Sequence, residues 1–172
     1  MTYQLNDQVF CIDEPALGLQ LQESVHGMEA EKRFYESGSL QSECFYRDQH
    51  LHGPSRFFSE SGALLSETWF WNGERVGIAR FFYSSGAIYG LLPFSFGRKV
   101  GRHEYFYENG QIKTIEKYCD GALHGESILY WPNGQIKRRS YFANGRRDQP
   151  DQFWNEEGLF LDPHPEPYDG SK

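Results

Sequence analysis

The sequence has few cysteines and no long apolar run. Its three cysteines, Cys11, Cys44 and Cys119, are far apart and odd in number, which argues against both a disulfide framework and a zinc site. No run approaches the ~18 apolar residues of a membrane-spanning helix, and residues 1–20 lack a basic stretch followed by an apolar one, so we expect no secretory signal. We therefore expect a soluble protein of a reducing compartment, the cytoplasm.

Positive charge is also scarce. The chain has 17 Lys and Arg against 24 Asp and Glu, a formal net charge of −7. Such a chain repels phosphate groups, which argues against nucleic acid and anionic lipid as ligands and favours a partner with a basic surface. Hydrophobic residues make up only 38% of the chain but aromatic residues 17%, so a core would be built from rings.

One repeat of 24 residues runs through most of the chain. Glycine recurs at that interval at Gly38, Gly62, Gly86, Gly110, Gly134 and Gly158. Numbering from this glycine, position −4 is always aromatic, position +2 is apolar, and position +8 is aromatic in five of the six units. Further glycines recur at +11 and +15, each in four units. A fixed period of this length indicates a repeat architecture.

Each unit predicts two strands and two turns. Dipeptides such as Asn72-Gly73, Asn109-Gly110 and Asp120-Gly121 favour tight turns, and the runs between them are rich in strand-forming residues. No segment has a sustained helical period. The sequence thus predicts an all-β fold: an elongated single-layer antiparallel β-meander of about six 24-residue hairpin units. It does not decide whether the sheet is open or curled. Because −4, +2 and +8 are even offsets, we expect their side chains to form one spine on one face.

Three regions follow from the repeat. Residues 1–31 are expected to be a degenerate repeat or an N-terminal cap, residues 32–160 the repeat array, and residues 161–172 a Pro-rich C-terminal tail. The tail has prolines at alternate positions, which cannot donate to a strand ladder.

Residues 107–113 (YENGQIK) and 118–125 (YCDGALHG) resemble the bacterial variant of the MORN repeat (membrane occupation and recognition nexus), as do residues 131–137 (WPNGQIK) and 34–40 (FYESGSL). The resemblance covers about Lys32 to Phe160. It implies a bacterial antitoxin or immunity protein of a toxin–antitoxin system. The broader family implies a scaffold at a membrane or in a multiprotein assembly.

The sequence offers no pattern for catalysis, a cofactor or a metal. His52 and His124 share one repeat offset before a turn glycine, which favours turn residues over metal ligands. Neither a G-x-S-x-G elbow nor a phosphate-binding glycine loop occurs. Glutamates at −2 (Glu36, Glu60, Glu108 and Glu156) are expected in a row along one edge. A glycosidase-like carboxylate pair there is the weaker interpretation, and an acidic edge that attracts a basic protein is the stronger one.

We therefore expect a non-enzymatic protein that binds and occludes a cognate toxin with a basic surface, for example a nuclease effector. The alternative is a scaffold for membrane or multiprotein assembly, and the oligomeric state is not predicted. Exposed rings rimmed by charge are typical of interfaces, although rings that cover the second face are an equal alternative. The residues predicted to contact the partner are Glu36, Glu43, Glu60, Glu67, Trp69, Trp71 and Tyr89.

Overall fold

The computed structural model describes residues 3–5, 8–10 and 28–161. They form a two-stranded ribbon and a fifteen-stranded sheet. The ribbon pairs β1 (Tyr3–Leu5) with β2 (Gln8–Phe10). None of the residues described is helical, so this part of the chain holds no helix that could cross a membrane. Most of the predicted N-terminal cap and residues 162–172 of the predicted tail lie outside the described residues.

The sheet is a single layer. Its main strands are β3 (Glu29–Phe34), β4 (Leu40–Arg47), β5 (His50–Phe58), β6 (Leu64–Trp71), β7 (Glu74–Phe82), β8 (Ile88–Ser95), β10 (Gly101–Phe106), β11 (Ile112–Cys119), β13 (Gly125–Tyr130), β14 (Ile136–Ala143), β16 (Gln152–Trp154) and β17 (Phe160–Leu161). Three short strands, β9 (Arg98–Lys99), β12 (Ala122–Leu123) and β15 (Arg146–Arg147), pair with β8, β11 and β14.

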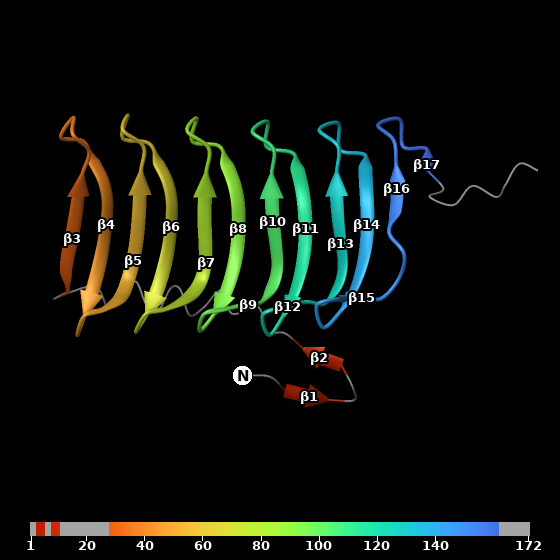
Figure 1. Cartoon of the computed structure of the whole chain (residues 1–172), viewed down its shortest axis with the longest axis horizontal. Helices are drawn as coiled ribbons and strands as arrows, with labels where there is room; N and C mark the ends of the chain where they lie inside the picture. The colour runs from red at the N-terminus through yellow and green to blue at the C-terminus, as the bar shows by residue number, and fades with distance from the viewer. Residues whose placement is uncertain (1–2, 6–7, 11–27, 162–172) are drawn as a thin grey trace, which may run out of the picture.

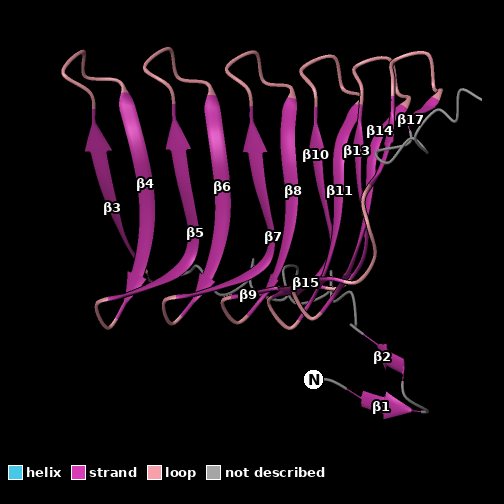
Figure 2. Ribbon diagram, turned by 45° about the vertical axis from the view of Figure 1, so that its right-hand side comes forward, coloured by secondary structure: helices cyan, strands magenta, loops and turns pink. Residues whose placement is uncertain are grey.

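The order of the main strands in the sheet follows their order in the chain, and all their pairings are antiparallel (Figures 1 and 2). The described strands from β3 to β17 form one open sheet, which confirms the predicted all-β meander and shows that the sheet is not curled. The loops that contain the repeating glycines lie along one edge, at the top of Figure 1, which we call the hairpin edge. The tighter turns after Arg47, Trp71, Ser95, Cys119 and Ala143 lie along the opposite edge, the turn edge.

Turn chemistry explains both edges. At the turn edge Asn72 and Gly73 both have positive φ, 47° and 85°, which is the backbone of a two-residue hairpin loop and which Asn-Gly adopts readily. At the hairpin edge Gly38 has φ 85°, and its amide donates to the carbonyl of Tyr35 at 2.9 Å. The glycine period in the sequence is therefore the period of left-handed turn positions.

Hydrogen bonds join neighbouring repeats at both edges, except that Ser59 replaces the ring donor at the hairpin edge of one repeat. At the hairpin edge a ring at position −3 donates to the carbonyl oxygen 23 residues later. These bonds run from Tyr35 to Phe58 (2.8 Å), Tyr83 to Phe106 (2.9 Å), Tyr107 to Tyr130 (2.8 Å) and Trp131 to Trp154 (3.1 Å). At the turn edge the amides of Gly73, Gly97, Gly121 and Gly145 donate to the carbonyls of Leu51, Arg75, Lys99 and Leu123, at 2.8–2.9 Å. Each repeat is therefore bonded mainly to its neighbours.

The predicted single spine is wrong because every full hairpin contains a bulge. Phe58 pairs with Leu64, but the preceding residue Phe57 pairs with Ser66, so Leu65 is an extra residue. The same shift occurs in the hairpins β3–β4, β7–β8, β10–β11 and β13–β14. An extra residue reverses the alternation of side chains. Rings at +8 therefore face away from those at −4 and +2: Phe94 is buried, whereas Phe34 and Ile88 are exposed.

The core is small and lies in the middle of the sheet. Among the described residues the buried hydrophobic side chains are those of Trp69, Val76, Ala79, Leu92, Phe94 and Ile115. Ala79, Leu92 and Phe94 form one cluster, against which Phe81 and Tyr105 pack. A single layer buries side chains only under their larger neighbours, so most positions stay partly exposed and both faces are available as surfaces.

Candidate binding surfaces

Two rows of directly paired residues define the two faces of the sheet. Partners in an antiparallel pair point to the same side, and the pairs join across eleven strands. One row reads Arg33, Ser42, Phe57, Ser66, Phe81, Gly90, Tyr105, Thr114, Leu129, Arg138 and Phe153. Its neighbours along each strand form a second row: Lys32, Glu43, Arg56, Glu67, Arg80, Leu91, Glu104, Ile115, Ile128, Arg139 and Gln152. We call the corresponding sides the aromatic face and the ladder face.

The N-terminal half of the ladder face is an unbroken series of ion pairs with alternating sign. Lys32 lies 3.2 Å from Glu43 and Arg56 lies 3.3 Å from Glu43. Arg56 then bonds Glu67 at 2.8 Å, and Arg80 bonds the other oxygen of Glu67 at 3.1 Å. Each of the two glutamates therefore contacts two cations, which compensates its charge within the sheet.

The ion pairs of this ladder reduce the accessibility and the net charge of the predicted contact residues Glu43 and Glu67. Their side chains are only 17% and 18% exposed, and both carboxylates are engaged by lysine or arginine. A basic partner would have to compete with those cations for the same oxygens. Sequence reasoning missed Lys32, Arg56 and Arg80, although the signal was present, because these residues all sit at −6 and the two glutamates both sit at +5.

The three predicted aromatic contacts lie in different environments. Trp69 is only 7% exposed and pairs with Pro54 and Val76, so its ring belongs to the packing of the sheet. Trp71 is partly exposed and lies against His52, with ring centres 4.4 Å apart. Tyr89 is also exposed.

Tyr89 stands edge-on to two further tyrosines, with ring centres 5.4 Å from Tyr83 and 6.0 Å from Tyr105. Because Tyr105 lies in the row of the aromatic face, these contacts place the Tyr89 ring on that face. Tyr89 and Trp71 therefore remain surface candidates, but the structure does not bring them together with Trp69 into one cluster.

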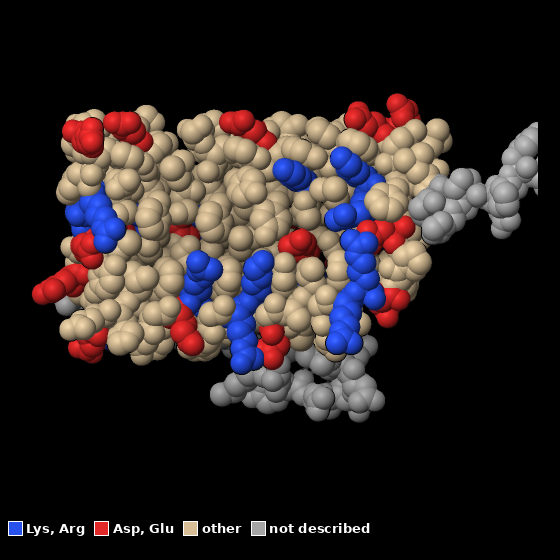
Figure 3. All heavy atoms as spheres, in the orientation of Figure 1, with Lys and Arg blue, Asp and Glu red and all other residues tan. Residues whose placement is uncertain are grey.

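The carboxylates at position −2 lie along the hairpin edge. Glu36, Glu60, Glu108 and Glu156 are all exposed, and Figure 3 shows Asp and Glu side chains spaced along this upper edge. Glu108 accepts a hydrogen bond from Ser85 at 2.7 Å. Within the described part of the chain none of these four carboxylates belongs to an ion pair. Of the predicted acidic contacts, Glu36 and Glu60 therefore present uncompensated charge.

Cations lie over aromatic rings in the lower half of the aromatic face. The guanidinium of Arg75 is 5.4 Å from the ring centre of Phe94, and Nζ of Lys99 is 4.6 Å from that of Tyr118. Figure 3 shows Lys and Arg gathered below the middle of the sheet and toward its C-terminal end. Such contacts orient a cation without neutralising it.

A buried histidine underlies these rings. His103 is fully buried, donates from Nε2 to the carbonyl of Pro93 at 2.9 Å, and packs against Phe94 and Tyr118. Burial lowers the pKa of His103 from 6.5 to about 4, so it is neutral at pH 7. The Tyr118 hydroxyl donates to Glu116 at 3.0 Å and accepts from Lys99 at 3.2 Å, and burial raises its pKa. His103 Nδ1 has no hydrogen-bond partner among the described residues, and full burial leaves this side chain without access to a substrate.

The other chemical candidates are structural. The described residues contain no group of three or more His, Cys, Asp or Glu that would hold a metal ion. His52 Nδ1 lies 2.9 Å from the side-chain oxygen of Asn72, and His124 Nδ1 accepts from the amide of Asn144. His52 lies within β5 and His124 directly before β13, and each contacts the asparagine of the next turn, His52 at its side chain and His124 at its backbone amide.

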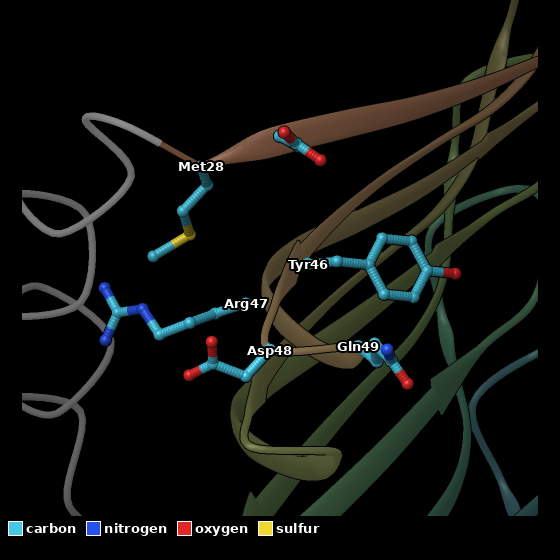
Figure 4. Close-up of a pocket in the computed structure, with 6 residues that line it drawn as sticks. Met28, Tyr46, Arg47, Asp48 and Gln49 are labelled. Carbon is cyan, nitrogen blue, oxygen red and sulfur yellow. The ribbon is translucent and has the colours of Figure 1, made fainter.

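A shallow hollow lies at the turn-edge end of β3 and β4. It is lined by Met28, Glu29, Tyr46, Arg47, Asp48 and Gln49 (Figure 4). Arg47 and Asp48 point out from the turn with opposite charges, and the Tyr46 side chain points away from them. No set of polar groups converges on a common point there, so the hollow does not define a ligand.

The comparisons with known proteins identify the repeat. Residues 30–48, 99–120 and 123–144 match the model of the MORN repeat variant, so MORN repeats are present in this chain. No curated protein matches it in sequence.

Solved structures with similar segments are larger proteins. A chain of the Glycosylation Associate Protein (Gap123) complex from Streptococcus agalactiae is 15% identical, with 60% of this chain and 19% of that chain covered and a TM-score of 0.36. A crystal structure of TarM is 14% identical, with 76% and 22% covered and a TM-score of 0.36. A mutant of S. aureus TarM in complex with fondaparinux, alpha-GlcNAc-glycerol and UDP is 15% identical, with 76% and 23% covered and a TM-score of 0.37. This chain spans about a fifth of the length of those chains, and a likeness this low transfers no activity.

Proposed function

We propose that this chain is a non-enzymatic binding protein, a bacterial antitoxin or immunity protein of the cytoplasm that neutralises a cognate toxin by binding and occluding it. The MORN repeats supply an extended, pre-formed surface, and the resemblance to the bacterial variant supplies the antitoxin role. A pre-formed surface loses little conformational entropy on binding.

The observation that carries the proposal is the row of exposed carboxylates at the hairpin edge. Adjacent repeats are two strands apart, about 9.6 Å. This is the spacing of Glu36 and Glu60, and the other carboxylates are two repeats apart because Ser84 and Pro132 interrupt the row. Both spacings exceed the Debye length of about 8 Å at physiological salt. The carboxylates thus act as nearly separate charges that together attract a basic surface and speed its encounter. A nuclease toxin fits this chemistry because its phosphate-binding cleft is basic, and an acidic edge would take the place of its substrate.

The test is binding to the product of the neighbouring gene, by pull-down and calorimetry. A one-to-one complex that abolishes the toxic activity is expected, and the absence of any complex would refute the proposal. Charge reversal should then locate the contact. The double variant Glu36→Lys, Glu60→Lys should slow association at low salt by about tenfold, with the difference fading at high salt.

A matched control is available at the turn edge. Glu74 is exposed, like Glu36 and Glu60, but lies at the opposite end of the strands. Glu74→Lys makes the same change of charge per residue and should leave the association rate nearly unchanged. Equal slowing by Glu74→Lys would mean that net charge, and not the hairpin edge, steers the partner.

The second candidate is a MORN-type scaffold for membrane or multiprotein assembly. The cations on the aromatic face, Arg75 and Lys99, favour it because they leave positive charge on an otherwise acidic chain. Salt-sensitive co-sedimentation with anionic vesicles, together with no toxin complex, would favour this role over the first.

A further inference from the structure

We propose that the aromatic face binds an acidic, proline-rich polypeptide segment in the polyproline II conformation, running across the strands. This site is separate from the carboxylates of the hairpin edge and takes a ligand of opposite charge. Its centre is the row Phe57, Phe81, Tyr105 and Leu129, which carries one large apolar side chain per repeat.

The period of this row selects the conformation of the ligand. Two strands separate successive large side chains, which corresponds to about 9.6 Å. A polyproline II helix advances about 9.3 Å per turn of three residues, so it drifts by only about 1 Å over three repeats. Two turns of α-helix advance about 10.8 Å and drift by about 3.6 Å over the same distance. A β-strand, with about 6.7 Å per residue pair, loses register within one repeat.

The residues between the large side chains are small. Ser66 lies between Phe57 and Phe81, Gly90 lies between Phe81 and Tyr105, and Thr114 lies between Tyr105 and Leu129. Large and small side chains therefore alternate along the row. Gly90 is itself buried beside the Tyr105 ring, so the accessible gaps are those at the half-buried Ser66 and Thr114. Residues of the ligand would enter the gaps at Ser66 and Thr114, as proline-rich segments enter aromatic-lined grooves. Phe57 is 48% exposed, and Phe81, Tyr105 and Leu129 are half-buried, so each large side chain of the row keeps part of its surface accessible.

The charges beside the row select an acidic segment. Arg138 belongs to the row itself, between Leu129 and Phe153. Lys113 and Lys137 stand over the rings of Tyr107 and Trp131, at 5.6 Å and 3.9 Å from the ring centres, in the same C-terminal repeats. None of these three cations has a carboxylate partner within the residues that the structure describes. At the other end of the row Arg33 is paired with Glu31, so the acidic residues of the ligand should lie toward β13 and β14.

The experiment measures binding of a fluorescein-labelled peptide of four Pro-Pro-Glu triplets to the full chain by fluorescence anisotropy. Its length of about 37 Å exceeds the ~29 Å of the row from Phe57 to Leu129. Saturable binding is expected, with weaker binding of the Pro-Pro-Lys peptide, which tests charge, and of the Ala-Ala-Glu peptide, which tests the pre-formed conformation.

Two variants locate the site, and one serves as control. Phe57→Ala should weaken binding about tenfold, as expected for an aromatic anchor. Ser66→Phe fills a gap and should weaken binding to a similar degree. Phe34→Ala removes an equally exposed ring, 57% against 48%, on the ladder face and should leave binding unchanged. Far-UV circular dichroism and thermal melting establish that each variant remains folded.

Three results would overturn the proposal: no saturable binding of the Pro-Pro-Glu peptide up to about 1 mM, equal weakening by Phe34→Ala and Phe57→Ala, or tighter binding of a single-stranded oligonucleotide or anionic vesicle at the same residues. The toxin complex tests a different edge with different variants. Failure of one proposal is therefore distinguishable from failure of the other.

Discussion

Acid should destabilise this protein through His103. The residue is fully buried against Phe94 and Tyr118, and burial lowers its pKa from 6.5 to about 4. Between about pH 4 and pH 6.5, His103 therefore binds a proton in the unfolded chain but not in the folded chain. Stability is complete above about pH 6.5 and falls as the pH drops toward 4. At about 1.4 kcal/mol per pH unit, the 2.5-unit interval, 6.5 minus 4, corresponds to about 3 kcal/mol.

Urea unfolding of the wild type and of His103→Gln, at several values between about pH 7 and pH 4, measures this contribution. The variant will be less stable at pH 7 because it loses packing, but its stability should fall less on acidification, by about 3 kcal/mol. Carboxylates titrate in both proteins, so their contribution cancels in the comparison. Parallel pH profiles for the two proteins would refute the assignment of His103 as a buried neutral group.

Two further substitutions test the ladder and the bonds between repeats. Arg56→Leu removes the cation shared by Glu43 and Glu67 and should lower the free energy of unfolding by about 1–2 kcal/mol, measured by urea titration; an unchanged midpoint would mean that the ladder contributes nothing. Tyr83→Phe removes only the hydroxyl that donates to the Phe106 carbonyl and should cost about 1 kcal/mol, seen as a lower melting temperature, whereas an unaltered melting curve would show that water replaces this bond without loss.

The repeat made most of the fold predictable. Gly38 and its five counterparts mark left-handed turns, and short aromatic runs between turns specify strands, so their spacing yields a meander, although only the structure shows that the sheet is open. The bulge was not predictable because its extra residue has no common chemistry: Gln41, Leu65, Tyr89, Lys113 and Lys137 occupy it. Without the bulge, the assignment of rings to faces failed at every hairpin.

The candidate sites were predictable only in part, for the same reason. Recognising that Glu43 and Glu67 face Arg56 requires the register of β4, β5 and β6, which the bulges set. The burial of Trp69 depends on Pro54 and Val76 on the two neighbouring strands, and only the strand register shows that these residues lie opposite Trp69. In contrast, the exposure of Glu36 follows directly from its position beside a turn glycine.

The bonds that join each unit to the next have an evolutionary consequence. From Tyr83 to Trp131 the donors at the hairpin edge recur every 24 residues and reach the carbonyl 23 residues onward. Duplication or excision of one whole unit therefore restores the same donors and acceptors at the new junction. The sheet can therefore lengthen or shorten in steps of about 9.6 Å without changes to the packing of the remaining repeats. This is possible because a single-layer sheet has no common core that fixes its length.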